Sequence, residues 1–146
     1  MKLKLVLFML LSTSLAFSQT HKTVQIDSKF LSETQEIQVY LPDSYKTSKK
    51  EYPTLYILDG QWHFANGVGI QKSLRVPGVL PEMIIVGITT KNTSDPLRRT
   101  ILIHESPKYL QFLEKELIPF INTTYRSSED RILFGWERGA DFANYA

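Results

Sequence analysis

Two uninterrupted apolar runs constrain the fold of this chain more than any other feature of its 146 residues. Residues 53–60 (PTLYILDG) and 83–88 (MIIVGI) lack the alternation of polar and apolar side chains that a strand with one wet face shows. Such runs are typical of strands buried on both faces of a largely parallel sheet. Because parallel strands need a crossover connection, residues 61–76 are predicted to form a helix, although Gly67 and Gly69 weaken it.

The flanking segments show other periods. Residues 24–31 and 36–41 are strand-like, and the second of them alternates apolar with more polar residues. From Ser106 to Ile121 the apolar residues recur at helical spacing, as in an amphipathic helix. Pro119 is expected to distort the last turn of this helix.

A third short apolar run, residues 131–134, precedes a helical stretch at 140–146. Strands that alternate with helices predict an α/β fold with a mostly parallel sheet and flanking helices. In such a sheet the functional groups belong at the carboxyl ends of the strands. Three segments occupy such positions, namely 59–63 (DGQWH), 87–89 (GIT) and 135–139 (GWERG).

The first 18 residues have the pattern of a secretory signal peptide. Lys2 and Lys4 precede an apolar run at 5–11, and a small-x-small site follows at 16–18 (AFS). The apolar run is too short to span a bilayer. We therefore expect cleavage after Ser18, a secreted or periplasmic location and one mature domain over residues 19–146.

Composition excludes several kinds of chemistry and partner. The chain has no cysteine, which rules out disulfides, thiolate metal sites and a cysteine nucleophile. No HExxH, Walker A or GxGxxG motif occurs, so neither a metal nor another cofactor is expected. Loss of residues 1–18 removes two lysines and no acid, which leaves 15 of the 17 basic residues to balance the 15 acidic ones. A neutral domain without a basic stripe is not expected to bind nucleic acid, nor, after signal cleavage, a membrane.

The third strand end carries the most information. In a nucleophile elbow, G-x-S-x-G occupies a strand-to-helix turn so tight that small residues must flank the nucleophile. The backbone N–H that follows the nucleophile then faces an oxyanion. Residues 135–139 place both glycines correctly, with Glu137 at the nucleophile position.

With this turn, the chain resembles the esterase branch of the α/β-hydrolases, the enterochelin-esterase and esterase-D-like group, over about residues 24–146. The resemblance implies the N-terminal part of an α/β-hydrolase-type sheet and hydrolysis of carboxylic or acyl esters. It also implies an oxyanion hole formed by the backbone N–H of Arg138 and one near Gly60 or Gln61. The segments that carry it follow the family's order: 37–45 (IQVYLPDSY), 52–60 (YPTLYILDG), 83–88, 112–121 (FLEKELIPFI) and 131–135 (RILFG).

Two departures from the family pattern accompany the resemblance. Glu137 stands where the resemblance implies the nucleophilic serine. The acid and the histidine of the triad would follow the elbow helix, beyond Ala146. We therefore expect a truncated reading of a longer exported hydrolase, inactive as given. Its strand 131–134 would form an apolar sheet edge through which the chain could associate with itself.

Glu137 leaves three interpretations open. It could be a carboxylate nucleophile, although a histidine would still be needed to activate water. It could be a loss-of-function substitution on a scaffold that binds ligand. It could also be simply tolerated, with its charge paired with Arg138 or stabilised by the N-terminus of the following helix. A carboxylate beside an oxyanion hole in any case argues against ordinary ester hydrolysis.

The remaining candidates would line a pocket. Trp62, His63 and Trp136 lie at the strand ends, although core packing is the favoured role for at least one tryptophan. His21, His63 and His104 precede the elbow, whereas the family histidine follows it, so surface or packing roles are expected for them. Two functions remain: an exported esterase, or a non-catalytic module of the same fold that binds a small ester or acyl ligand or another chain.

Overall fold

The computed structural model describes residues 21–76, 78–90 and 100–146. The predicted signal peptide, with its cleavage site after Ser18, lies outside these residues. Within them, no helix is both long enough and apolar enough to cross a membrane.

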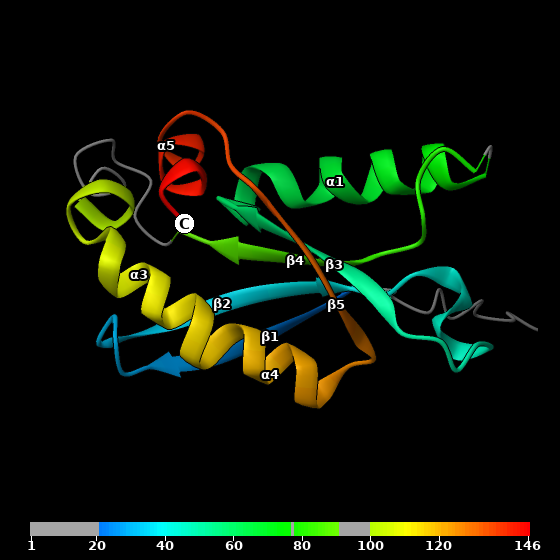
Figure 1. Ribbon diagram of the computed structural model, residues 1–146, viewed down its shortest axis with the longest axis horizontal. Coiled ribbons are helices and arrows are strands. Elements are labelled where there is room, and N and C mark those ends of the chain that lie inside the picture. The colour runs from blue at the N-terminus through cyan, green and yellow to red at the C-terminus, as the bar shows by residue number, and fades with distance from the viewer. Residues whose placement is uncertain (1–20, 77, 91–99) are drawn as a thin grey trace, which may run out of the picture.

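Five strands of the described residues form one mixed sheet in the order β1-β2-β4-β3-β5 (Figure 1). β3 is parallel to both of its neighbours, β4 and β5, which confirms the parallel core predicted from the apolar runs. β2 is antiparallel to both β1 and β4, so the first two strands extend the sheet as a hairpin. The strands are β1 (His21–Ser28), β2 (Glu33–Tyr40), β3 (Tyr52–Leu58), β4 (Ile84–Thr89) and β5 (Ser127–Phe134).

Helices cover both faces of the sheet (Figure 1). α1 connects β3 to β4 on one face, as the crossover prediction required. The larger core lies on the other face, where Tyr109, Phe112 and Leu117 pack against the strands. The helical elements are η1 (Asp43–Lys46), α1 (Gly60–Arg75), η2 (Thr100–His104), α3 (Ser106–Phe112), η3 (Leu113–Leu117), α4 (Ile118–Thr124) and α5 (Arg138–Tyr145).

The predicted amphipathic helix is present as α3, η3 and α4 in unbroken succession, and Pro119 explains the change of helix type within it. In a regular α-helix the proline ring clashes with the carbonyl four residues earlier. The preceding turn, η3, is π-helical, and the N–H of Ile118 donates to the carbonyl of Leu113, five residues back. This wider turn accommodates the proline, so the distortion precedes Pro119 and the helix continues to Thr124.

β5 forms one edge of the described sheet. It starts at Ser127, earlier than the apolar run suggested, because its first half also pairs with β3. Ile132 and Phe134 are 49% and 41% exposed on this strand. The expected apolar edge is therefore present in the described residues, and self-association through it stays a prediction.

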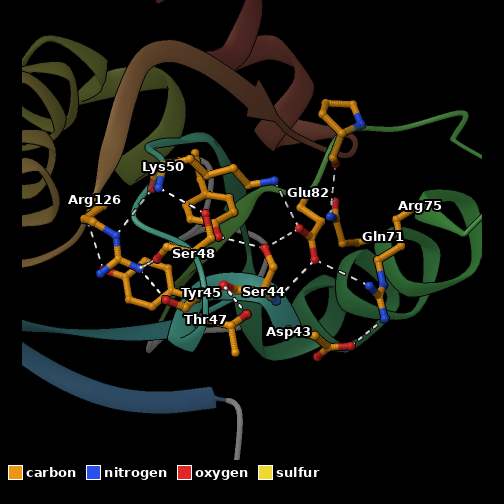
Figure 2. A network of polar contacts seen from close by, with 12 residues as sticks. Asp43, Ser44, Tyr45, Thr47, Ser48, Lys50, Gln71, Arg75, Glu82 and Arg126 are labelled. Carbon is orange, nitrogen blue, oxygen red and sulfur yellow. Dashed lines mark hydrogen bonds and ion pairs between the residues drawn. The ribbon is translucent and has the colours of Figure 1, made fainter.

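A polar network joins the C-terminal end of α1 to the segments that precede β3 and β4 (Figure 2). Glu82, in the loop before β4, accepts hydrogen bonds from the N–H and the hydroxyl of Ser44 and forms ion pairs with Lys50 (3.2 Å) and Arg75 (3.4 Å). Arg75 also forms an ion pair with Asp43 at 2.5 Å. The hydrogen bond from the Ser44 hydroxyl, aided by Lys50, lowers the pKa of the Glu82 carboxyl, although burial opposes the shift.

Arg126 extends this network to the start of β5. Its guanidinium lies 3.8 Å from the centroid of the Tyr45 ring and donates to the carbonyls of Ser48 (3.0 Å) and Lys50 (3.3 Å). Its backbone N–H donates to the Tyr45 hydroxyl at 3.0 Å. The loop before β3 is thereby fixed against the segment before β5.

Candidate functional site

Three strand ends meet at one edge of the sheet. β3 lies between β4 and β5 and is parallel to both, so the three carboxyl ends lie together. The turns that follow them are residues 59–63, residue 90 and residues 135–139. We call this region the carboxyl edge, and it contains the site residues proposed from the sequence.

Residues 135–139 form a tight strand-to-helix turn. Glu137 has φ 50° and ψ −111°, a backbone conformation that residues other than glycine rarely adopt. The N–H of Gly139 donates to the carbonyl of Trp136, and that of Ala140 to the carbonyl of Glu137, both at 2.9 Å. A Cβ atom at Gly135 would lie 2.1 Å from the carbonyl oxygen of Gly139. The turn therefore requires glycine at position 135.

The turn at the start of α1 is equally confined. Asp59 is fully buried and adopts a left-handed conformation with φ 54°. A Cβ atom at Gly60 would lie 2.8 Å from the carbonyl carbon of Gly87 in β4, so α1 begins against the backbone of that strand. Both features hold the first turn of α1 in one place.

Gly139 brings the two turns together. A Cβ atom at this position would lie 3.4 Å from the Cβ of Leu58 and 3.5 Å from Oδ2 of Asp59. Gln61 and Arg138, the two positions expected to supply oxyanion donors, therefore lie in the first turns of two adjoining helices. The first N–H groups of a helix have no carbonyl partner within it and can point at a ligand.

Thr90 joins α1 to β4 and was not singled out from the sequence. Its hydroxyl donates to Oδ1 of Asp59 at 2.8 Å, and its N–H donates to Oε1 of Gln61 at 2.9 Å. The only available sequence signal was its place directly after a buried strand. That signal does not distinguish it from Thr89, which ends β4.

The two charged side chains of the elbow differ in exposure, since Arg138 is half-buried. Glu137 is exposed, and Nη1 of Arg138 lies 3.9 Å from Oδ2 of Asp141 on the next turn of α5. Phe142 anchors this helix, since it is fully buried and its ring packs edge-on against Tyr109 with 5.1 Å between centroids. Burial raises the pKa of Tyr109, and the negative charge of Asp59 adds to the effect.

His63, one of the candidate pocket residues, lines a cavity. It is half-buried, lies edge-on to Phe134 with 5.9 Å between ring centroids, and borders an apolar cavity of about 400 Å³ beside α1. Trp62 and Trp136 do not line this cavity. The other two histidines lie elsewhere: His21 begins β1 and His104 ends η2, and both are exposed.

Neither tryptophan packs in the core, so the prediction of a core role for at least one was wrong. Trp62 is 45% exposed and Trp136 is 59% exposed. Trp62 lies in the first turn of α1, and Trp136 lies in the turn between β5 and α5. Aromatic character suggested burial, but both side chains lie at the carboxyl edge, where the described residues leave them exposed.

The described residues contain no group of three or more His, Asp or Glu side chains arranged to hold a metal ion. The groups at the carboxyl edge include backbone donors, the buried carboxylate of Asp59, the hydroxyl of Thr90, the half-buried imidazole of His63 and the exposed carboxylate of Glu137.

Comparisons with known proteins identify a related family and a shared fold. Residues 28–144 match the family described as "Putative esterase". Among curated proteins, the uncharacterized protein YbbA of Bacillus subtilis is 35% identical over 57 residues, which are 39% of this chain and 23% of YbbA.

Solved structures share the fold. An IroE-like serine hydrolase from Shewanella oneidensis has a TM-score of 0.71 and 28% identity, over 84% of this chain and 44% of that one. The enterobactin esterase FES from Shigella flexneri has a TM-score of 0.72 and 20% identity, over 88% of this chain and 33% of that one. The chain thus spans less than half the length of these relatives.

Proposed function

Because the chain belongs to the esterase family described as "Putative esterase", we propose that its carboxyl edge binds the carbonyl group of a carboxylic or acyl ester without forming an acyl-serine. The observation that carries the proposal is the strained backbone of residue 137 beside the first turn of α1. An oxyanion hole needs backbone N–H donors held in fixed positions. The backbone conformation at residue 137 can supply this whichever side chain the residue bears.

The ester carbonyl would be held by backbone N–H groups at Gln61 and Arg138. Gly139 places the first turns of α1 and α5 against each other, so donors from both can converge on one oxygen. Backbone donors of this kind are fixed before the ligand arrives and need no reorganisation. The ligand in this proposal is a neutral ester, because the exposed carboxylate of Glu137 disfavours an anion at the same place.

Glu137 accounts for the lack of turnover in this proposal. The family's serine would attack the ester carbonyl through its hydroxyl oxygen and create an oxyanion in the hole. A carboxylate at this position has no hydroxyl to give, and its negative charge opposes the charge that would develop nearby. Binding therefore survives the substitution and ordinary acyl transfer does not.

The proposal includes export. Its support is the basic, apolar and small-residue pattern of residues 1–18. N-terminal sequencing of the protein from the extracytoplasmic fraction tests this, with Gln19 expected as the first residue and a retained Met1 contradicting it.

Binding is best tested with phenyl butyrate and the protein as it is exported. Trp62 and Trp136 are both exposed at the carboxyl edge, so their fluorescence reports a ligand there. We expect a saturable fluorescence change and no accompanying release of phenol. The variants Trp62→Phe and Trp136→Phe show which tryptophan gives the fluorescence change.

Glu137→Gln is the matched variant for this titration, because it removes the charge and keeps the shape. We expect its dissociation constant for phenyl butyrate to stay within about twofold of the native value, since the backbone donors are unchanged. An unsaturable response in the native protein would refute ester binding at this edge.

A further inference from the structure

Thr90 makes two hydrogen bonds that together span the start of α1. Its hydroxyl donates to Oδ1 of Asp59, the residue that precedes α1, and its N–H donates to Oε1 of Gln61 in the first turn. Thr90 itself is 6% exposed, and Asp59 is fully buried. Thr90, directly after β4, is therefore hydrogen-bonded to the side chains of both Asp59 and Gln61, and the segment between them carries the Gln61 N–H.

The segment held by Thr90 does not rest in a relaxed conformation. Asp59 has φ 54°, in the left-handed region that costs a non-glycine residue free energy. The close approach of Gly60 to the backbone of Gly87 leaves this turn little space for another path. Such a conformation persists only where surrounding contacts hold it, and the hydroxyl of Thr90 supplies one of them inside the protein.

Oδ2 of Asp59, the other oxygen of the carboxylate that Thr90 binds, faces the first turn of α5. A Cβ atom at Gly139 would lie only 3.5 Å from it. The Asp59 carboxylate therefore lies between the two turns that would supply the oxyanion donors.

We propose that Thr90 is a positioning residue of the ester site, which sets the place of the Gln61 N–H through Asp59 and the Gln61 side chain. The inference rests on the proposed function, since it assigns the ester carbonyl to that N–H. Removing the hydroxyl leaves a buried carboxylate oxygen without this donor. Asp59 then relaxes from its strained conformation, and the backbone N–H of Gln61 is displaced with it.

A pair of ligands isolates recognition of the carbonyl. Phenyl butyrate and butyl phenyl ether differ only in that a methylene replaces the carbonyl. For Thr90→Val, which keeps the shape and removes the hydroxyl, we expect about a tenfold loss in the ratio of ester to ether affinity, the size of one lost hydrogen bond. Thr90→Ser keeps the hydroxyl and is expected to retain the native ratio.

The outcomes separate this inference from the proposed function. A native protein that binds the ester no better than the ether refutes the proposed function. A native preference that Thr90→Val leaves intact, or a loss of affinity for both ligands alike, overturns the positioning role alone. If thermal denaturation shows that Thr90→Val does not fold, Gln61→Met removes the second bond and is expected to lower the same ratio, whereas a retained ratio overturns the inference.

Discussion

Backbone strain is concentrated at the carboxyl edge. Within the described part of the chain three non-glycine residues have positive φ, and two of them, Asp59 and Glu137, lie there. Each such residue costs about 1–3 kcal/mol and is tolerated where its surroundings leave no other path. At Glu137 the surrounding constraint is the approach of Gly135 to Gly139. At Asp59 the approach of Gly60 to β4 and the hydrogen bond from the Thr90 hydroxyl act together.

Gly135→Ala tests the constraint at the elbow. The new Cβ atom would lie 2.1 Å from the carbonyl oxygen of Gly139, so the turn has to open. We expect the free energy of unfolding to fall by at least about 2 kcal/mol in chemical denaturation.

Gly69→Ala is the matched control for this substitution. Gly69 lies inside α1, and a Cβ atom there would meet nothing within 4 Å. Alanine should therefore raise the free energy of unfolding by up to about 1 kcal/mol, because it costs less conformational entropy in a helix than glycine. Equal effects of the two substitutions would mean that the elbow is not as tight as described.

At the scale of elements, the ion-pair network around Glu82 holds η1, α1 and the loop before β4 together (Figure 2). It lies at the end of α1 opposite to the carboxyl edge. The contacts differ from an ordinary surface ion pair because the Glu82 side chain is only 15% exposed. One side chain therefore contributes to the position of the helix whose first turn forms half of the proposed site.

Glu82→Gln should lower the free energy of unfolding by about 1–2 kcal/mol at pH 7. The pKa of Glu82 is lowered in the folded protein from its usual value of 4.5. The ionised side chain therefore makes its full contribution to the free energy of unfolding above that value. This contribution is lost as the pH falls through the lowered pKa of the folded protein. The difference between native and variant proteins should therefore be constant near neutral pH and shrink in acid.

Glu105→Gln is the control for the network. Glu105 pairs with Lys108 at 2.8 Å on the helix surface, and both side chains are at least 40% exposed. We expect a change below about 0.5 kcal/mol. A Glu82→Gln effect of the same size, or one that does not diminish in acid, would show that the network does not act as described.

At the scale of the whole molecule, the sequence predicted the parts governed by local pattern. The buried runs became β3 and β4, the crossover became α1, and the elbow appeared at residues 135–139. The exposure of Trp62 and Trp136, the π-helical turn before Pro119 and the role of Thr90 were not predicted. Thr90 contacts residues 29 and 31 positions away, and no local period encodes such contacts.

The central claim is that the carboxyl edge keeps the geometry of an ester site while Glu137 prevents turnover. The most direct test is the release of p-nitrophenolate from p-nitrophenyl butyrate by the native protein, measured beside Glu137→Gln. We expect that neither protein releases product faster than buffer alone, although both bind phenyl butyrate. Saturable release by the native protein that Glu137→Gln abolishes would contradict it, because Glu137 would then be the nucleophile of an active esterase.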